Sequence, residues 1–597
     1  MKKQKGRAAA LPFCFAPRAR FLREMRGELL HPPPAPPKTF EKGTGMGNFL
    51  PEFCGERLTR KGFPVIMRAR RGAEEIRPDG AFARGLGQSR RALRKNARRK
   101  GKKMRATEIV KVPDAFQSMN EERENRDFRI FLNGEQATVS AIRVSRLPYN
   151  RIYEGNQRPL SQSEVIGLVS FEGEGEVRVE VKTEKPFSSA VVRPLSKGVA
   201  VTREGGRVSF TLPAHGQYSL EFDDVHTSVE LFYDPPKIFA AKESYTHYYG
   251  SGVHYTGIVS LKSGDRVYID RDAQVYGGFY AEGAEDIRIE GYGRINGKVV
   301  ARVAYPFLHN RGDLMFVNCK NVSVEGVTLL DAAFWVSSFF NCDGIRMENV
   351  KITGQWRYNT DGIDLVSCKN AEIRNCFVRA FDDVIVLKGY SQFEGYTIHT
   401  VENILVEDCV LWCDWGRTVE VGCETVAREY RNIRFEGCDL IHNAAVAIDI
   451  QNGDCAFVHD FTVKNSTVEF QRTALPEVLQ WTDEQVYDAE GKIGMPYFLW
   501  IANRKYHTGD ALYDGKRAAY SEGVPFGRVE DVTVENIRIF GEEGLPSYKL
   551  MIGSADPDIP FKNIRVANIS IDGTAVTDTA RFDAEVDERT ENLELFV

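Results

Sequence analysis

Several features are missing from this 597-residue sequence, and each absence narrows the function. No run of eighteen apolar residues occurs, which argues against a membrane-spanning helix. No two cysteines are separated by two residues and the histidines form no cluster, so the sequence offers no convincing zinc site. Beyond residue 103 there is no basic excess: 52 Lys and Arg stand against 75 Asp and Glu. A nucleic acid partner is therefore not expected, because phosphate binding needs clustered cations.

The first 103 residues differ from the rest, with 27 Lys and Arg against 8 Asp and Glu and the proline-rich stretch HPPPAPPK. This composition predicts disorder. Three interpretations are open: a basic tail that binds a partner, a secretion signal, or upstream sequence outside the working protein. The signal is the weakest, because its nine-residue apolar run contains proline and leads into Arg18 and Arg20. We favour the third interpretation, with Met104 close to the true start.

Residues 104–235 are expected to form a small antiparallel β-sandwich. From Phe128 to Tyr233, short stretches alternate apolar and polar residues between Gly, Pro and Asp turns, as in VRVEV, VSFTL, YSLEF and VELFY. The domain is interpreted either as a structural cap that protects an exposed strand edge or as a substrate-binding module. We favour the cap, because no cluster of exposed aromatic residues stands out.

Residues 236–597 carry a recurring unit of two short strands around a Gly, Asn, Asp or Cys corner. The units begin with DIRIEGYGRI at 286 and include NVSVEGVTLL at 321, NAEIRNCFVR at 370, NILVEDCVLW at 403 and NIRFEGCDLI at 432. A repeat of about 23 to 35 residues made only of strands is what a three-sided coil requires. The predicted fold is therefore all-β, a right-handed parallel β-helix preceded by the sandwich.

One interval, residues 470–530, is much longer than the others and rich in Tyr, Trp and charged residues. Long turns on one flank of a solenoid often build a binding cleft. We interpret this insertion as a cleft wall, with a packed excursion without function as the alternative.

The cysteines follow the repeat. Nine of the eleven lie between positions 319 and 455, and Cys376, Cys409 and Cys438 occupy the same position of successive units. This register predicts a buried ladder of free thiols rather than disulfides or metal ligands. Free thiols, together with the lack of a credible signal, predict a cytoplasmic protein.

Acidic residues concentrate in NTDGIDLVSCKNAEIRNCFVRAFDDVIVLKG, residues 359–389. Asp361 and Asp382 are 21 positions apart, about one coil, so they are expected to lie above one another with Asp383 adjacent. Crowded carboxylates repel and raise at least one pKa, which provides the protonated acid and the ionised base that glycoside hydrolysis needs. Turn preference alone explains any one of these residues, but explains NTDG and FDD at one-coil spacing poorly.

These motifs resemble those of the polygalacturonases, family twenty-eight of the glycoside hydrolases, and more loosely those of the family forty-nine dextranases. The resemblance covers roughly residues 236–575. It matches NTDG at Asn359 to Gly362 and the paired aspartates at Asp382 and Asp383. It implies single-displacement inversion without metal or organic cofactor, with Asp382 as general acid and with Asp361 and Asp383 activating water.

Two elements depart from the family pattern. Arg417, in WGRTVEVG, stands where the family has a histidine, and the Arg-x-Lys element that holds a substrate carboxylate has no clean counterpart. Trp415 and Tyr358 are further candidates for stacking on sugars, and His442 is a weaker candidate. The predicted substrate-binding residues are Asn359, Arg417, Lys388, Trp356, Arg504 and Lys505.

The sequence thus predicts a hydrolase of pectin-type oligosaccharides, either galacturonan or rhamnogalacturonan. A dextranase-like hydrolase of neutral glucans is the alternative enzyme, suggested by the sandwich and the missing lysine. A polyuronate lyase is disfavoured, because lyases of this fold commonly use calcium and a basic residue. A non-catalytic, carbohydrate-binding β-helix remains the alternative of a different class. The expected partner in each case is an oligosaccharide or polysaccharide.

Overall fold

The computed structural model describes ten stretches of the chain. The segment 1–103, Met104, Arg504, Lys505 and most of the 470–530 insertion lie outside them, so the predictions made for those residues stay predictions. The described residues are 105–106, 124–146, 159–302, 310–389, 399–470, 473–474, 493–494, 496–503, 526–541 and 548–597.

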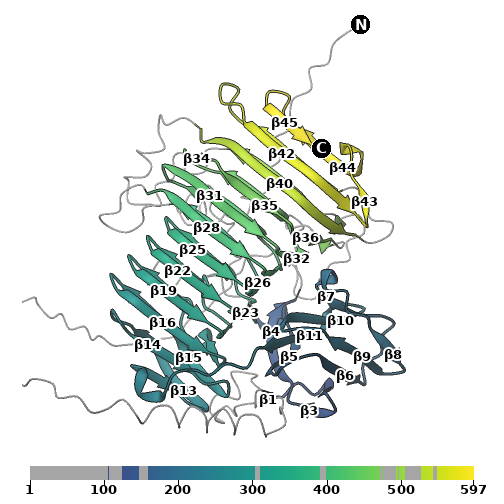
Figure 1. Ribbon diagram of the computed structural model, residues 1–597, viewed down its shortest axis with the longest axis vertical. Coiled ribbons are helices and arrows are strands. Elements are labelled where there is room, and N and C mark those ends of the chain that lie inside the picture. The colour runs from purple at the N-terminus through teal and green to yellow at the C-terminus, as the bar shows by residue number, and fades with distance from the viewer. Residues whose placement is uncertain are drawn as a thin grey trace, which may run out of the picture. The chain divides into compact units, whose positions relative to one another are not determined.

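Almost all regular structure in the described stretches is β-strand, and no α-helix occurs there. A 32-stranded sheet winds into a right-handed parallel β-helix, as predicted (Figure 1). From β15 to β31 each strand pairs with the strand three places later, so one coil contributes one strand to each of three faces. None of the described residues form a helix that is long and apolar enough to cross a membrane. Short 3-10 turns occur at η2 (Leu160–Gln162), η3 (Leu195–Lys197), η4 (Lys242–Ser244), η5 (Gly297–Val299) and η7 (Thr579–Arg581).

The first face, called the aspartate face below, follows the turns that carry the predicted catalytic residues. Its strands are β18 (Leu314–Val317), β21 (Ser337–Phe340), β24 (Ile363–Val366), β27 (Ile385–Gly389), β30 (Arg417–Thr425), β33 (Val446–Asn452), β39 (Tyr497–Asn503), β41 (Tyr548–Ser554) and β44 (Phe582–Val586).

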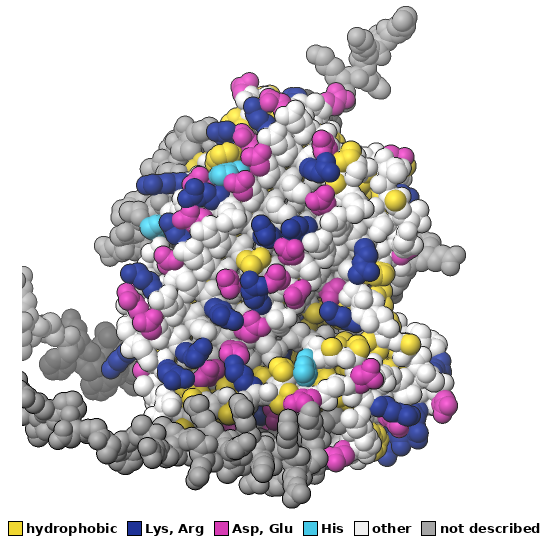
Figure 2. Space-filling model, in the orientation of Figure 1, with side chains coloured by type: hydrophobic (Ala, Val, Ile, Leu, Met, Phe, Trp, Pro, Cys, Tyr) yellow, Lys and Arg dark blue, Asp and Glu magenta, His cyan; other side chains and the backbone are white. Residues whose placement is uncertain are grey.

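The second face, the exposed face, presents alternate side chains to solvent. Basic and acidic side chains are interspersed over it (Figure 2). Its strands are β12 (His247–Tyr249), β14 (Arg266–Ile269), β16 (Glu285–Gly291), β19 (Lys320–Glu325), β22 (Asp343–Glu348), β25 (Lys369–Arg374), β28 (Val401–Glu407), β31 (Glu429–Glu436), β34 (Phe457–Val458), β35 (Phe461–Lys464), β40 (Arg528–Phe540), β42 (Lys562–Ile571) and β45 (Glu591–Leu595).

The third face, the covered face, lies beneath the sandwich. Two long strands of the first coils, β13 (Gly252–Ser260) and β15 (Ala273–Glu282), bend between this face and the aspartate face, since β15 pairs with both β17 and β18. The short pairs β37 (Thr473–Ala474) with β38 (Ile493–Gly494), and β43 (Thr574–Ala575) with β42, lie outside the coils. The strands of the covered face are β17 (Arg294–Asn296), β20 (Thr328–Leu330), β23 (Lys351–Thr353), β26 (Phe377–Ala380), β29 (Val410–Cys413), β32 (Asp439–Asn443) and β36 (Thr467–Glu469).

Stacking of identical positions explains why this sequence coils. Inward Val, Ile, Leu and Phe side chains form one continuous core along the solenoid. Cys376, Cys409 and Cys438 are buried and free, and the Cys376 amide donates to Cys409 Sγ at 3.4 Å, so the predicted thiol ladder is confirmed. A second ladder, Cys319, Cys342 and Cys368, runs beside it.

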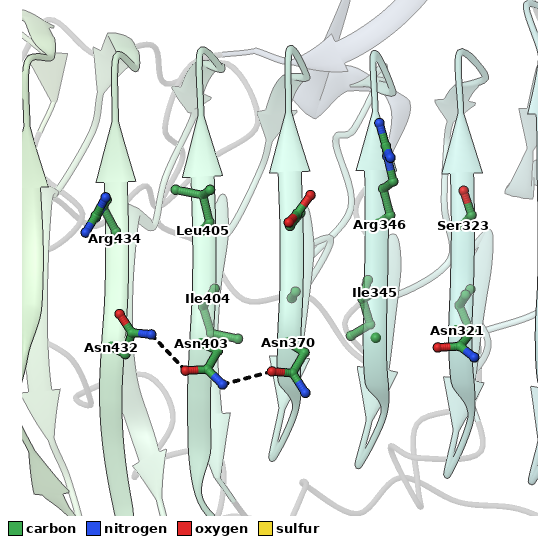
Figure 3. Close-up of a pocket in the computed structure, with 14 residues that line it drawn as sticks. Asn321, Ser323, Ile345, Arg346, Asn370, Asn403, Ile404, Leu405, Asn432 and Arg434 are labelled. Carbon is green, nitrogen blue, oxygen red and sulfur yellow. Dashed lines mark hydrogen bonds between the residues drawn. The ribbon is translucent and has the colours of Figure 1, made fainter.

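Asparagines fix the corners of the exposed face. Asn432 donates to Asn403 and Asn403 donates to Asn370, each at 2.8 Å (Figure 3). All three have positive φ, between 50° and 58°, a conformation that Asn adopts more easily than most residues. The shallow groove that they line lies on the exposed face, away from the predicted catalytic turns.

The sandwich consists of two sheets. Their shared core contains Ile130, Val179 and Leu220. One pair, β5 with β11, runs parallel, so the expectation of a purely antiparallel sandwich is wrong for that pair. One sheet has β3 (Glu135–Ala137), β2 (Phe128–Leu132), β6 (Val177–Thr183), β9 (Arg207–Leu212) and β8 (Thr202–Glu204). The other has β1 (Arg105–Ala106), β5 (Ser163–Glu172), β11 (Asp224–Asp234), β10 (Gly216–Phe222) and β7 (Ala190–Arg193), with β4 (Ser140–Ser145) on β5.

The sandwich packs against the side of the solenoid. Phe232 of β11 contacts Phe377 of β26, with ring centroids 5.1 Å apart, inside an apolar cluster that joins β4, β5 and β11 to the covered face. Buried charges cross the same interface: Asp234 of β11 pairs with Lys351 of β23. The prediction that the sandwich protects a terminal strand edge is therefore wrong, since it covers one lateral face.

Candidate active site

The register of the aspartate face aligns two of the three predicted catalytic residues. Ile363 of β24 pairs with Ile385 of β27, so Asp361 and Asp383, two residues before each, occupy the same position of successive coils. The amide of Gly362 donates to the Asp383 carbonyl at 2.8 Å. The sequence predicted Asp361 over Asp382, which is wrong by one residue. The coil spans 22 positions here, and Asp382 lies one residue before the aligned pair.

All three carboxylates are buried. Asp361 is 0% exposed, Asp382 1% and Asp383 4%. Neighbouring charges in a low-dielectric setting interact strongly, which favours unequal protonation among such groups. The predicted repulsion among the three aspartates therefore takes place in the interior of the protein and not on a turn exposed to water.

Arg302 fixes the turn that carries Asp361. Its guanidinium donates to the backbone carbonyl of Tyr358 and, at 2.7 Å, to Asn359 Oδ1. Asn359 has φ 55°. Its side-chain oxygen accepts the hydrogen bond from Arg302, and this contact holds the turn. Burial, reinforced by Arg357, lowers the pKa of Arg302 to about 10. Nothing in the sequence pointed to Arg302, since it lies 57 residues before Asn359.

Lys388 lies at the centre of the aspartate cluster. Its ammonium is 2.8 Å from Asp361, 3.2 Å from Asp364 and 4.0 Å from Asp383, and it also lies over the Trp335 ring. Burial by itself lowers the pKa of Lys388, but the facing carboxylates outweigh it and hold the pKa well above its ordinary value. The ammonium therefore stays charged and favours the ionised form of its partners.

Arg417 contacts Asp383 through both its backbone and its side chain. Its amide donates to Asp383 Oδ1 at 3.2 Å, and its guanidinium donates to the same oxygen at 3.3 Å. The guanidinium also lies 3.5 Å from Asp449 and 4.0 Å from Glu420. The predicted Arg417 thus joins the aspartate cluster and holds Asp383 in place.

Three further carboxylates lie on this face that the sequence analysis did not single out: Asp364, Glu420 and Asp449. Glu420 is in register with Asp449 on the next strand, and all three are fully buried. Burial, followed by repulsion from Asp361, holds the pKa of Asp364 well above its ordinary value, although Lys388 opposes the shift. Burial, followed by repulsion from Asp383, likewise holds the pKa of Glu420 well above its ordinary value. Period-2 alternation from Gly362 and from Thr418 was the available signal for two of these positions, Asp364 and Glu420.

Gly416 leaves the room that the paired aspartates occupy. A Cβ at this position would lie 2.5 Å from Asp383 Oδ1 and 2.7 Å from the Asp382 carbonyl carbon. Real Cβ atoms do not approach other atoms so closely, so any larger residue displaces the turn that carries Asp382 and Asp383.

Aromatic side chains from three successive turns lie together beside the aspartates. Trp415 stacks on Phe381 at 5.3 Å and 9°, and Tyr358 meets both rings edge-on. Phe381, Trp415 and Tyr358 precede Asp382, Gly416 and Asn359 respectively. Trp415 and Tyr358 thus lie on turns that adjoin the carboxylates, and their stacking on sugars stays a prediction.

Two other candidates point elsewhere. Trp356 is 7% exposed, and its indole N–H donates to Asp331 at 2.8 Å. His442 lies on the covered face, where its Nε2 is 2.8 Å from Glu221 of the sandwich. Trp356 thus contacts the preceding coil, and His442 faces the sandwich.

The arrangement supplies the groups that acid–base chemistry needs: buried carboxylates in unequal surroundings, with two cations among them. No group of three or more His, Cys, Asp or Glu in the described residues is arranged to hold a metal ion.

Comparisons with known proteins cover the stretch of chain that contains this site. The model for the glycosyl hydrolases family 28 matches residues 288–480, which include all three aspartates, Lys388 and Arg417. A polygalacturonase from Juniperus ashei is 25% identical over 252 residues, which cover 42% of this chain and 41% of that protein. One from Cryptomeria japonica is 23% identical over 42% of this chain and 40% of that protein.

The resemblance to family 28 is confirmed for this stretch. The chain aligns with about two fifths of the length of these relatives. Dex49A from Penicillium minioluteum shares the fold, with a TM-score of 0.52 and 13% identity over 79% of this chain and 94% of that one.

Proposed function

We propose that this protein is a glycoside hydrolase that cleaves O-glycosidic bonds in pectin-type oligosaccharides, galacturonan or rhamnogalacturonan, by single-displacement inversion. The observation that carries the proposal is the burial of Asp361, Asp382 and Asp383 at successive turns of one β-helix face. This stretch matches family 28, and the relatives that it aligns with are polygalacturonases.

The contacts support a division of roles among the three aspartates. Asp361 and Asp383 each face a cation, Lys388 and Arg417 respectively, which favours two ionised carboxylates able to activate water. Asp382 lies one residue off this aligned pair and serves as the general acid that protonates the leaving oxygen. Water then attacks the anomeric carbon as the glycosidic bond breaks, and one of the two bases takes the proton of the water.

The thiol ladders support a further part of the proposal, a cytoplasmic location. The nine cysteines in the described residues are all free. Such thiols persist more readily where glutathione keeps them reduced. Cell fractionation with detection of the native chain tests this; recovery from the medium or periplasm would contradict it.

The activity is tested with the full chain and its Asp382→Asn variant on galacturonan, rhamnogalacturonan and dextran oligosaccharides, by measuring new reducing ends. We expect release from a pectic substrate and a loss of at least about 100-fold in the variant. Asp343→Asn, the same substitution on the exposed face, is the matched control and keeps full activity. Release from dextran alone favours the glucan hydrolase, and binding without release favours a carbohydrate-binding protein.

A further inference from the structure

The charge balance along the aspartate face bears on which sugar the site accepts. The strands β24, β27, β30 and β33 carry two basic side chains, Lys388 and Arg417. They carry four acidic ones, Asp364, Glu420, Glu424 and Asp449, and the three aspartates of the preceding turns add to this excess. A substrate therefore meets a surface with a strong surplus of carboxyl groups.

Both basic groups already face carboxylates of the protein. Lys388 lies within 4.0 Å of Asp361, Asp364 and Asp383. Arg417 lies within 4.0 Å of Asp383, Glu420 and Asp449. A substrate carboxylate near Arg417 would have to compete with three buried acidic groups for one guanidinium.

Glu420 and Asp449 suit a different kind of ligand. A carboxylate accepts hydrogen bonds from sugar hydroxyls, and it does so most strongly where water is excluded. The next residue in register after Asp449 is Trp500 of β39, whose ring lies 4.6 Å from that of Tyr497. An aromatic face beside acceptor oxygens matches a sugar that has apolar C–H faces and hydroxyls but no charge.

We propose that the part of the site formed by Arg417, Glu420, Asp449 and Trp500 binds a neutral glycosyl residue of the substrate. This inference rests on the proposed function and deepens it. Within the pectin-type substrates it selects a backbone in which uronic acids alternate with neutral sugars, rather than an uninterrupted galacturonan. Glu420 and Asp449 are then specificity-determining residues, which recognise hydroxyl groups and exclude uronates.

The test measures binding rather than turnover, so that it is independent of catalysis. The full-length Asp382→Asn protein is titrated calorimetrically with three probes: trigalacturonate, the same trisaccharide with its carboxyl groups reduced to alcohols, and a rhamnogalacturonan tetrasaccharide. We expect at least one of the two probes that contain neutral residues to bind ten-fold or more tightly than trigalacturonate. Equal or tighter binding of trigalacturonate overturns the proposal, and so does failure of all three probes to bind.

A second measurement shows which residues weaken the binding of trigalacturonate. Adding Glu420→Gln and Asp449→Asn to the Asp382→Asn protein preserves size and removes two of the carboxyl groups that occupy Arg417. We expect the disadvantage of trigalacturonate to fall to three-fold or less, whereas Asp343→Asn on the exposed face leaves it unchanged. An unaltered disadvantage in a folded triple variant overturns the assignment to these two residues. The comparison of probes on Asp382→Asn alone still decides the proposal if the triple variant does not fold.

The two proposals fail in different ways. If a neutral probe binds but the native chain cleaves no pectic substrate, the hydrolase assignment is wrong and the neutral subsite stands. If the native chain cleaves galacturonan and trigalacturonate binds best, the hydrolase stands and the neutral subsite is wrong.

Discussion

The ammonium of Lys388 lies 2.8 Å from the carboxylate of Asp361, and both side chains are almost completely buried. Asp361 lies in the turn before β24 and Lys388 lies on β27 of the next coil, so the coil itself brings them together. Because Asp364 and Asp383 also lie within 4.0 Å of the same ammonium, this one cation faces three neighbouring carboxyl groups. The site therefore depends on a residue that donates no proton in the proposed reaction.

Replacement of Lys388 by Met is expected to destabilise the protein and to reduce hydrolysis. Removing one partner of a buried ion pair leaves uncompensated charge, which costs about 3–5 kcal/mol. It also raises the pKa of Asp364 further, because Lys388 is the group that opposes that shift. Chemical denaturation and kcat measurements check the variant. Lys320→Met, which removes an exposed pair with Glu285, is the control and should cost about 0–1 kcal/mol. Equal costs for the two variants would contradict the central role of Lys388.

Gly416→Ala is expected to abolish most activity while the fold persists, because the added methyl group overlaps Asp383 Oδ1 and the Asp382 backbone. Gly553→Ala is the matched control: on β41 of the same face, the nearest atom to an added Cβ is 3.7 Å away. Reducing-sugar release and circular dichroism are measured for both. Full activity in Gly416→Ala would show that the position of the paired aspartates is not critical.

Asp313→Asn is expected to stabilise the protein at neutral pH. Asp313 is fully buried, and burial followed by repulsion from Asp331 holds its pKa well above the ordinary value. The folded state then keeps a proton that the unfolded chain has lost. Stability falls as the pH rises from the unfolded pKa through the folded one, by about 1.4 kcal/mol per pH unit. The amide group of the Asp313→Asn variant does not ionise, so the variant does not lose stability in this way as the pH rises.

Thermal melting of the native chain and of Asp313→Asn between pH 4 and pH 8 measures how their difference in stability changes with pH. The advantage of Asp313→Asn should grow with pH and become small near pH 4, where the folded state is protonated and about half of the unfolded chains are too. An advantage that is independent of pH would mean that packing, rather than ionisation, explains the change.

The interface between sandwich and solenoid should depend on the buried pair of Asp234 and Lys351. Lys351→Met leaves the Asp234 carboxylate facing Arg271 and Asn349 only, and is expected to cost about 3–5 kcal/mol. The double variant Asp234→Asn/Lys351→Met removes both charges and should recover part of that loss. Urea denaturation measures both, and additive losses would mean that the two residues act independently.

The repeat pattern of the sequence was sufficient to predict the solenoid, because inward Val and Ile at equal repeat positions can stack only in successive coils. The same register placed the cysteine ladder correctly. NTDG and the paired aspartates were sufficient to find Asp361, Asp382 and Asp383, and the structure brings all three together. Their catalytic roles remain predictions until the variants are measured.

The partners of these residues were harder to predict. Arg302 reaches Asn359 across 57 positions, a distance that no local motif encodes. Glu420 and Asp449 lie on outward positions that are polar in any strand exposed to solvent, so nothing in their spacing distinguished a buried acidic site. The lateral packing of the sandwich was missed for a related reason: alternation shows which side of a strand is buried, but not which surface buries it.

The measurement that tests the central claim most directly is proton NMR of the first product released by the full chain from a pectic oligosaccharide. If Asp361 and Asp383 activate water while Asp382 protonates the leaving oxygen, the new reducing end appears first in the anomeric configuration opposite to that of the cleaved bond, and mutarotation follows. The Asp382→Asn protein should give no such signal. A first-formed product that retains the configuration of the cleaved bond would contradict the proposed single displacement.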